Sequence, residues 1–474
     1  MTAFFPNGFH AGRPSQGGPW GLTRPAKPAL GKGRLLLLTV WIASLTVGLD
    51  MVNELKPFDL AALAGCLVFS GVMARWRLRH DRLLAWAIGF VGMVALGSLV
   101  TLFREIAFVG LAVILLRVYR LFGYVALFGI IRYLGLNPRQ LRILLLAMLA
   151  AAVVQAVLIV LQQFEVVPLL WPEKELYYGT HCGPSGTLGV NHLNVVLFMS
   201  VAISCVVALW RGPGWRAVLL RPWLLATIPF MAAAVVYGRA RSALLAAAVL
   251  ALGAVRHAQG AVLVVLALLV TAVVGTRTVL QDNQAYSMVQ EDFLDRWDSA
   301  DGSVDDLYGL DAGRPLIWGR TLEALGRRID VLLIGTGFQN FANLDPRSAA
   351  AHCLYLHVLV ELGLAGLFVF LAWMRSLWFD LRAMERMPQP DAAAVGHAGT
   401  MCLLTLLVLG IFNESVYPAR ALPGAMGFCL AFFAIATHRG WLWGGPGLDR
   451  PAMAAAARRP IATASGFAHQ VGSQ

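Results

Sequence analysis

Long apolar stretches alternate with short polar turns along most of this chain. Most of them approach the roughly 20 residues that a helix needs to cross the hydrocarbon core of a bilayer. The pattern predicts an all-α, polytopic transmembrane protein with about twelve spans. The expected spans are residues 34–53, 57–74, 83–103, 114–134, 141–162, 190–210, 222–238, 242–256, 259–276, 352–374, 397–412 and 424–438.

The spans divide the chain into five parts. Residues 1–33 carry Pro, Gly and basic residues with no apolar core followed by a cleavage site, so we expect a cytoplasmic tail. Residues 34–276 hold spans one to nine, and residues 352–438 hold spans ten to twelve. The outer segment between them, 277–351, is too long for a turn and contains helix-like stretches, so we expect a partly helical loop. Residues 439–474 are expected to be a disordered cytoplasmic tail.

Composition and charge agree with a membrane protein. Of 474 residues, 58% are hydrophobic and only 14% are charged, which excludes a soluble globular protein. The net charge of +12 indicates orientation in the membrane rather than nucleic-acid binding. Basic residues gather in every second turn, which places the N-terminus in the cytoplasm. They are Arg75, Arg77, Arg79, Arg82, Arg139, Arg142, Arg211, Arg216, Arg221, Arg256, Arg375, Arg382 and Arg386.

With this orientation, four polar residues converge on the outer face. Arg239 and Arg241 lie where the seventh span ends and the eighth begins, Arg314 lies in the long outer loop, and His352 precedes the tenth span. Guanidinium groups suit phosphate oxygens, and an imidazole can move a proton near neutral pH. The set predicts an anionic, phosphate-bearing substrate at the outer interface. Each arginine taken alone is more often a membrane anchor than a ligand, and that alternative stays open.

Other polar positions have two interpretations each. Asn191 and Asn194, at the mouth of the sixth span, are helix caps or ligands. Arg117 and Arg120 reach a lipid phosphate or simply lie at the interface. Glu361 would lie about 13 Å into the tenth span at 1.5 Å per helical residue, and it is a substrate contact or half of a buried pair that orients helices.

Two further patterns are easily mistaken for cofactor sites. Gly335 to Gly337 imitate part of a dinucleotide fingerprint, but the third glycine and its strand are missing, so a turn is expected. His352 and His357 are five residues apart and would lie on different faces of a helix, which does not make a zinc pair. We expect no structural metal and no cofactor.

Four segments in sequence order resemble the O-antigen ligase and polymerase family, a group of bacterial inner-membrane proteins. The block IGTGFQNFANLDPRSAAAHCLYLHVLVELGLAGLFVFL resembles its signature of a glycine-rich turn, a loop histidine and an ELG-x-x-G helix. SGTLGVNHLN resembles its G-x-x-x-N-x-N segment, RARSALLA its SR-x-x-L-L segment, and GRPLIWGRTLEAL its R-x-x-x-W stretch. Ala240 and Cys353 stand where the family often has serine and asparagine.

The resemblance implies a function. Family members transfer a glycan from undecaprenyl diphosphate, on the periplasmic face, to the hydroxyl of an acceptor. The acceptor is lipid A core in the ligases and a growing polysaccharide, as another lipid-linked repeat unit, in the polymerases. Matched by motif, Arg241 and Arg314 would hold the diphosphate, and His352 would activate the hydroxyl, without a metal ion. The expected partners are therefore the undecaprenyl-diphosphate-linked glycan, the acceptor and membrane lipids.

Ligase and polymerase stay open as alternatives, and a polysaccharide transporter is a third. Against the transporter, the polar residues gather on one face rather than at the midplane of the membrane, and the long loop does not divide two equal halves.

Overall fold

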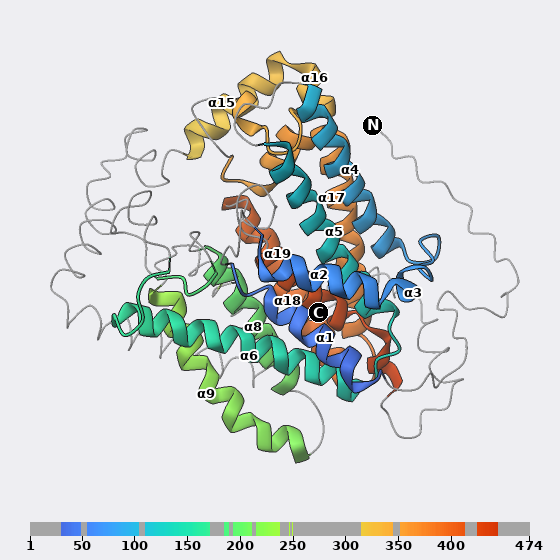
Figure 1. Ribbon diagram of the computed structural model, residues 1–474, viewed down its shortest axis with the longest axis vertical. Coiled ribbons are helices and arrows are strands. Elements are labelled where there is room, and N and C mark those ends of the chain that lie inside the picture. Colours follow the sequence, from blue (N-terminus) through green and yellow to red (C-terminus); the bar gives the residue numbers. More distant parts are fainter. Residues whose placement is uncertain are drawn as a thin grey trace, which may run out of the picture.

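The chain folds into packed helices (Figure 1). The structure is a computed structural model and describes residues 30–48, 55–103, 110–170, 184–188, 193–210, 215–237, 246, 249, 314–344, 351–412 and 424–443. Its α-helices are α1 (Lys32–Ser44), α2 (Pro57–Val68), α3 (Ser70–Met73), α4 (Arg82–Phe103), α5 (Leu111–Tyr133), α6 (Pro138–Gln163), α8 (Leu193–Trp210), α9 (Trp215–Tyr237), α15 (Arg314–Arg327), α16 (Ile329–Ile334), α17 (Leu354–Glu385), α18 (Pro390–Phe412) and α19 (Gly424–Ala436). Two short 3₁₀-helices are η3 (Phe341–Asn343) and η4 (Arg439–Trp443).

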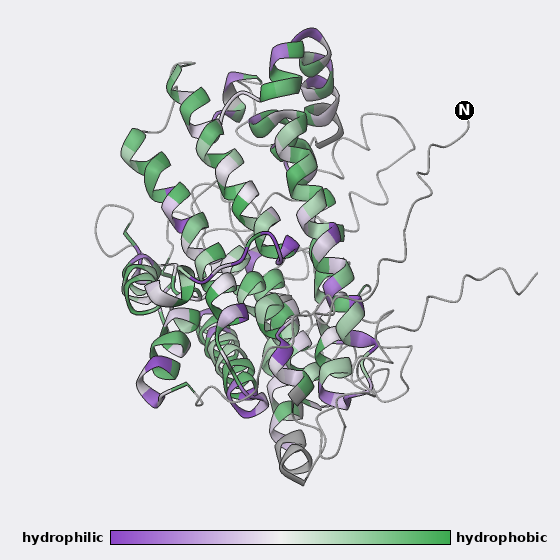
Figure 2. Cartoon of the chain, turned by 90° about the vertical axis from the view of Figure 1, so that its right-hand side faces the viewer, coloured by the Kyte–Doolittle hydropathy of each residue, from purple (hydrophilic) through white to green (hydrophobic). Residues whose placement is uncertain are grey.

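Six helices in the described ranges are long and apolar enough to cross a membrane. They span Arg82–Phe103, Leu111–Tyr133, Pro138–Gln163, Leu354–Glu385, Pro390–Ile411 and Gly424–Leu442. The helices are hydrophobic along most of their length, as Figure 2 shows. The prediction of an all-α membrane protein is confirmed for this part of the chain. The predicted eighth and ninth spans lie outside the described residues apart from residues 246 and 249, as do residues 1–29, 277–313 and 444–474.

The predicted C-terminal end of the first span is wrong, because α1 stops at Ser44 rather than at residue 53. Beyond it, the carbonyl of Thr46 accepts a hydrogen bond from the Thr187 hydroxyl at 2.8 Å, and the N–H of Gly48 donates to the Thr187 carbonyl at 2.6 Å. Backbone groups that bond to a distant turn are not available for a further helical turn. The helix ends for that reason.

Two other spans are interrupted. The predicted second span is divided at Phe69 into α2 and α3. The predicted tenth span continues past residue 374 to Glu385, and it breaks at Gly363, whose φ is 67°. Residues 439–443, predicted as part of a disordered tail, form η4. Helix formation is confirmed for the helix-like stretch predicted within residues 277–351, where α15 and α16 lie.

α4, α5 and α17 lie side by side in the core, with α15 and α16 at one end of them (Figure 1). α17 packs against α4 and α18, and α5 packs against α2 and α19. Aromatic rings fill the contact between α4 and α17: the ring of Phe90 lies 5.5 Å from that of Phe370 and 5.6 Å from that of Trp373. Such contacts stabilise pairs of helices in an apolar environment by close packing.

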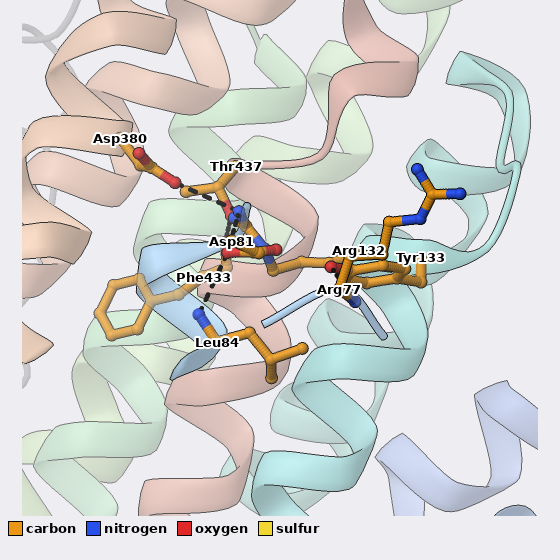
Figure 3. A network of polar contacts seen from close by, with 8 residues as sticks. All are labelled: Arg77, Asp81, Leu84, Arg132, Tyr133, Asp380, Phe433 and Thr437. Atoms are coloured by element: carbon orange, nitrogen blue, oxygen red, sulfur yellow. Dashed lines mark hydrogen bonds and ion pairs between the residues drawn. The ribbon is translucent and has the colours of Figure 1, made fainter. Parts of the chain in front are cut away.

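Four helix ends meet around Arg132, at the end of α5 (Figure 3). Its guanidinium lies 3.2 Å from the carboxylate of Asp81, which precedes α4, and 3.3 Å from that of Asp380 on α17. It also donates a hydrogen bond of 2.7 Å to the hydroxyl of Thr437, which follows α19. Arg132 therefore connects the start of α4 with the final turns of α5, α17 and α19.

The basic turns of the sequence gather at this same end. The turns from α3 to α4, from α5 to α6 and from α17 to α18 all lie here, since the helices that they join begin or end here. Arg142 at the start of α6 pairs with Asp391 at the start of α18 at 2.6 Å. The alternation of helix directions predicted from the arginines is therefore confirmed for these described helices.

We expect Thr437→Val to lower the free energy of unfolding by about 1.5–3 kcal/mol, because it removes a buried acceptor for the charged Arg132 guanidinium at nearly constant volume. Thr405→Val is the matched control, since the Thr405 hydroxyl is buried and donates to the Met401 carbonyl of its own helix. Unfolding in mixed micelles with a denaturing detergent measures both changes. Equal losses for the two variants would show that the contact with Arg132 adds nothing.

Candidate functional site

The turn that follows α16 lies against the break in α17. The N–H groups of Thr336 and Gly337 donate to the carbonyls of Val360 and Glu361, at 2.7 and 3.1 Å. In an unbroken helix those carbonyls would accept from the next helical turn, but the chain departs from helical geometry at Gly363. The turn thus supplies hydrogen-bond donors to carbonyl groups that have no helical partner at the break.

Two glycines allow this close approach of backbone to backbone. A Cβ atom on Gly335 would lie 2.2 Å from the carbonyl oxygen of Glu361, and one on Gly363 would lie 2.3 Å from that of Leu333. Both glycines also have positive φ, of 87° and 67°, which L residues rarely adopt. The turn predicted at residues 335–337 is therefore confirmed.

Helices α4 and α5 hold the same turn from the other side. The N–H of Phe338 donates to the carbonyl of Gly97 at 3.1 Å, and the hydroxyl of Thr101 donates to the Phe338 carbonyl at 2.8 Å. The guanidinium of Arg117 on α5 donates to the side chain of Gln339. Since α4 starts at the Arg132 network and Gly97 and Thr101 lie toward its other end, this turn is at the opposite end of the molecule.

His352 lies at this opposite end, two residues before the start of α17. Its φ is 50°, in the left-handed region, which costs a residue other than glycine about 1–2 kcal/mol. The preceding carbonyl, that of Ala351, accepts a 2.8 Å hydrogen bond from the indole N–H of Trp318 on α15. Unusual backbone conformations of this kind cluster at functional sites, and Gln339, with φ 66°, is a second one nearby in the sequence and on the same end.

A buried histidine and a buried acid follow on the first part of α17. Nε2 of His357 lies 3.1 Å from Oε1 of Glu361, and each residue is only 1% exposed. The ring of Phe341 stacks on the His357 ring, with 5.3 Å between centroids and 12° between planes. Glu361 thus has a buried partner, but the partner belongs to the same helix, so the pair does not orient two helices as one of its two interpretations required. The role of His357 was missed from the sequence, although its spacing of four residues from Glu361 was a usable signal.

Two glutamines of α6 bind the backbone of the short segment 184–188 that precedes α8. Gln155 accepts a hydrogen bond from the N–H of Thr187, and Gln162 accepts one from that of Gly186, both at 2.9 Å. Neither glutamine was predicted, although their seven-residue spacing places them on one face of an apolar helix. Asn194, on α8, is 1% exposed, and among the described residues its amide has no hydrogen-bond partner. A buried amide with open donors and acceptors suits a ligand contact.

The remaining predicted site residues are either paired elsewhere or not described. Arg120 is buried, and its guanidinium lies 2.9 Å from the carboxylate of Asp59 on α2, so we leave it out of the candidate site. Arg314 is the first residue of α15, and the described atoms do not include its side chain. Arg239, Arg241 and Asn191 lie outside the described residues, and their roles stay predictions.

The described candidate site therefore joins three segments. They are the start of α15, the turn after α16, and the loop and first turns of α17. Within the described ranges no group of three or more His, Cys, Asp or Glu side chains could hold a metal ion. No protein-family model matches this chain and no curated protein matches it, so the resemblance of its motifs rests on the residues themselves.

Proposed function

We propose that this chain is a membrane glycosyltransferase of the O-antigen ligase kind, which transfers a glycan from undecaprenyl diphosphate to a hydroxyl of lipid A core. The hydrogen bond from Trp318 to the carbonyl of Ala351 carries this proposal. Trp318 lies one helical turn after Arg314, about 6 Å along the axis of α15. The bond therefore brings the helix that begins with the motif arginine to the loop that carries His352.

The proposed reaction is a substitution at the anomeric carbon of the glycan. The imidazole of His352 accepts the proton of the acceptor hydroxyl, and the hydroxyl oxygen forms a bond to the anomeric carbon. The bond between that carbon and the diphosphate oxygen breaks, and undecaprenyl diphosphate leaves with the electron pair. Arg314 and Arg241 would stabilise the negative charge on the leaving group, as fixed cations do in a site of low dielectric.

The arrangement in the membrane supports the same proposal. The basic turns around Arg132 would face the cytoplasm by the positive-inside bias, so the candidate site at the opposite end would face the periplasm. We propose the full arrangement of twelve spans in the inner membrane, with residues 277–351 as a periplasmic loop. Exposed apolar side chains near Thr101, those of Leu99, Leu102 and Phe103, offer a surface along which the polyprenyl chain of the donor can lie.

Gel analysis of lipopolysaccharide and secreted polysaccharide tests the proposal in cells that lack this chain, with and without the wild-type copy. A ligase predicts loss of long glycan from lipid A core, with lipid-linked polymer accumulating. Accumulation of single lipid-linked repeat units would instead indicate the polymerase. Unchanged profiles in both fractions would refute the proposal.

The purified protein in lipid vesicles separates an enzyme from a transporter. We expect wild-type protein to move a labelled glycan from its lipid diphosphate to added lipid A core, so that the label changes its covalent partner. A transporter would change only the side of the membrane on which the lipid-linked glycan is found.

A further inference from the structure

The buried pair of His357 and Glu361 does not join two helices, since both residues belong to α17. In this it differs from the pair of Arg120 and Asp59, which connects α5 with α2. Placing two ionisable side chains in an apolar interior is unfavourable unless they are paired, and here the pairing adds no link between elements. Its direct effect is to hold the His357 ring in one orientation.

The ring is held on several sides. Its Nε2 faces the Glu361 carboxylate at 3.1 Å, Phe341 covers one of its faces, and its Nδ1 accepts a hydrogen bond of 3.5 Å from the N–H of Ala351. For Nδ1 to accept, a neutral His357 carries its ring proton on Nε2, which lies 3.1 Å from the Glu361 carboxylate.

Ala351 is therefore fixed at both of its backbone groups. Its N–H donates to His357, and its carbonyl accepts from Trp318 at 2.8 Å. Its side chain is fully buried. The next residue is His352, whose left-handed backbone conformation is unfavourable unless its neighbours hold it. The chain of contacts from Glu361 through His357 to Ala351 thus ends at the residue before the candidate base.

We propose that His357 is a positioning residue for His352, oriented by Glu361, and that it sets the place of the His352 imidazole relative to the acceptor hydroxyl; this rests on the proposed function. A displacement of about 1 Å in a reacting group can lower the rate about 10²-fold. His357 touches no substrate in this proposal, so its loss lowers turnover and leaves donor binding unchanged.

The test compares His357→Leu, which has no acceptor, with His357→Gln, whose amide oxygen can accept from Ala351. We expect His357→Leu to lower kcat for glycan transfer about 10–100-fold with an unchanged KM for the lipid-linked donor. His357→Gln should keep kcat within about 3-fold of wild type, because its amide oxygen can still accept from the N–H of Ala351.

His397→Leu is the matched control. His397 is also a buried histidine, but it belongs to α18, and its Nδ1 lies 3.0 Å from the carboxylate of Glu385, the last residue of α17. It should leave kcat and KM unchanged. A structural effect shared by buried histidines would lower activity equally in both variants.

Reaction of the Cys353 thiol with a maleimide gives a readout that does not depend on activity. Cys353 is half-buried and adjacent to His352, and peptide mapping identifies its adduct. We expect faster modification in His357→Leu than in wild type, His357→Gln or His397→Leu.

The outcomes separate this inference from the function on which it rests. If wild-type protein transfers glycan, His352→Ala does not, and His357→Leu keeps wild-type kcat, the positioning role is refuted and the function stands. If wild-type protein transfers no glycan, the function fails, and the positioning role fails with it. Unchanged Cys353 modification in His357→Leu would refute the ordering of the loop in either case.

Discussion

Replacing His352 by alanine is expected to lower the turnover of glycan transfer by about 10²–10⁴-fold, the range that a positioned general base contributes. His352 precedes α17 with a left-handed backbone, held between Trp318 and His357 through Ala351. Removing its imidazole leaves no base at that position for the acceptor proton. Arg314 and Arg241, proposed to hold the diphosphate, are unchanged in the variant, so the KM for the donor should stay close to that of wild type.

The measurement is the initial rate of transfer from a labelled lipid-linked glycan to lipid A core in vesicles. His80→Ala is the control, since His80 is an exposed histidine beside Asp81, at the end of the bundle opposite His352. It should retain wild-type turnover. Retention of more than a tenth of wild-type turnover by His352→Ala would rule out its role as the base.

Replacing Asp59 by alanine is expected to lower the free energy of unfolding by about 3–5 kcal/mol. The Arg120 guanidinium lies 2.9 Å from the Asp59 carboxylate, and both side chains are almost fully buried. Without this carboxylate, a permanent positive charge stays in an apolar interior. The variant also loses the hydrogen bond from the Lys56 N–H to the carboxylate, at 2.8 Å, which caps the start of α2.

Denaturing detergent in mixed micelles again measures the change. Glu323→Ala is the matched control, because Glu323 pairs with Arg327 on the exposed surface of α15, where an ion pair contributes about 0–1 kcal/mol. The double variant Asp59→Asn with Arg120→Met should recover much of the stability, since it removes both charges at similar volume. Equal stability losses in Asp59→Ala and Glu323→Ala would contradict the buried pair.

The candidate site was predictable in part. The motifs predict that Arg314 and His352, which are 38 positions apart in the sequence, belong to one site. The structure connects the segments that carry them through the hydrogen bond between Trp318 and Ala351. The roles of His357 and of Gln155 were not predicted: the spacing of such residues shows that they share a helix face with Glu361 or Gln162, but not which loop they bind. Only the contact itself distinguishes these cases.

The sequence by itself determined the class of the protein and the direction of its helices. Apolar stretches of bilayer length require helices, since the backbone must satisfy its own hydrogen bonds in lipid. The arginines in alternate turns anticipated the end at which α4 begins and α5 and α17 end, where Arg132 binds Asp81 and Asp380.

Tertiary structure alone decided where helices stop and break. The carbonyl of Thr46 bonds to Thr187, so α1 ends early, and the turn at Thr336 bonds to the carbonyl of Val360, so α17 can break at Gly363. Hydropathy is a property of side chains averaged along a segment. Helix ends depend on which backbone groups find a partner elsewhere in the fold, and such partners come from residues far apart in the sequence.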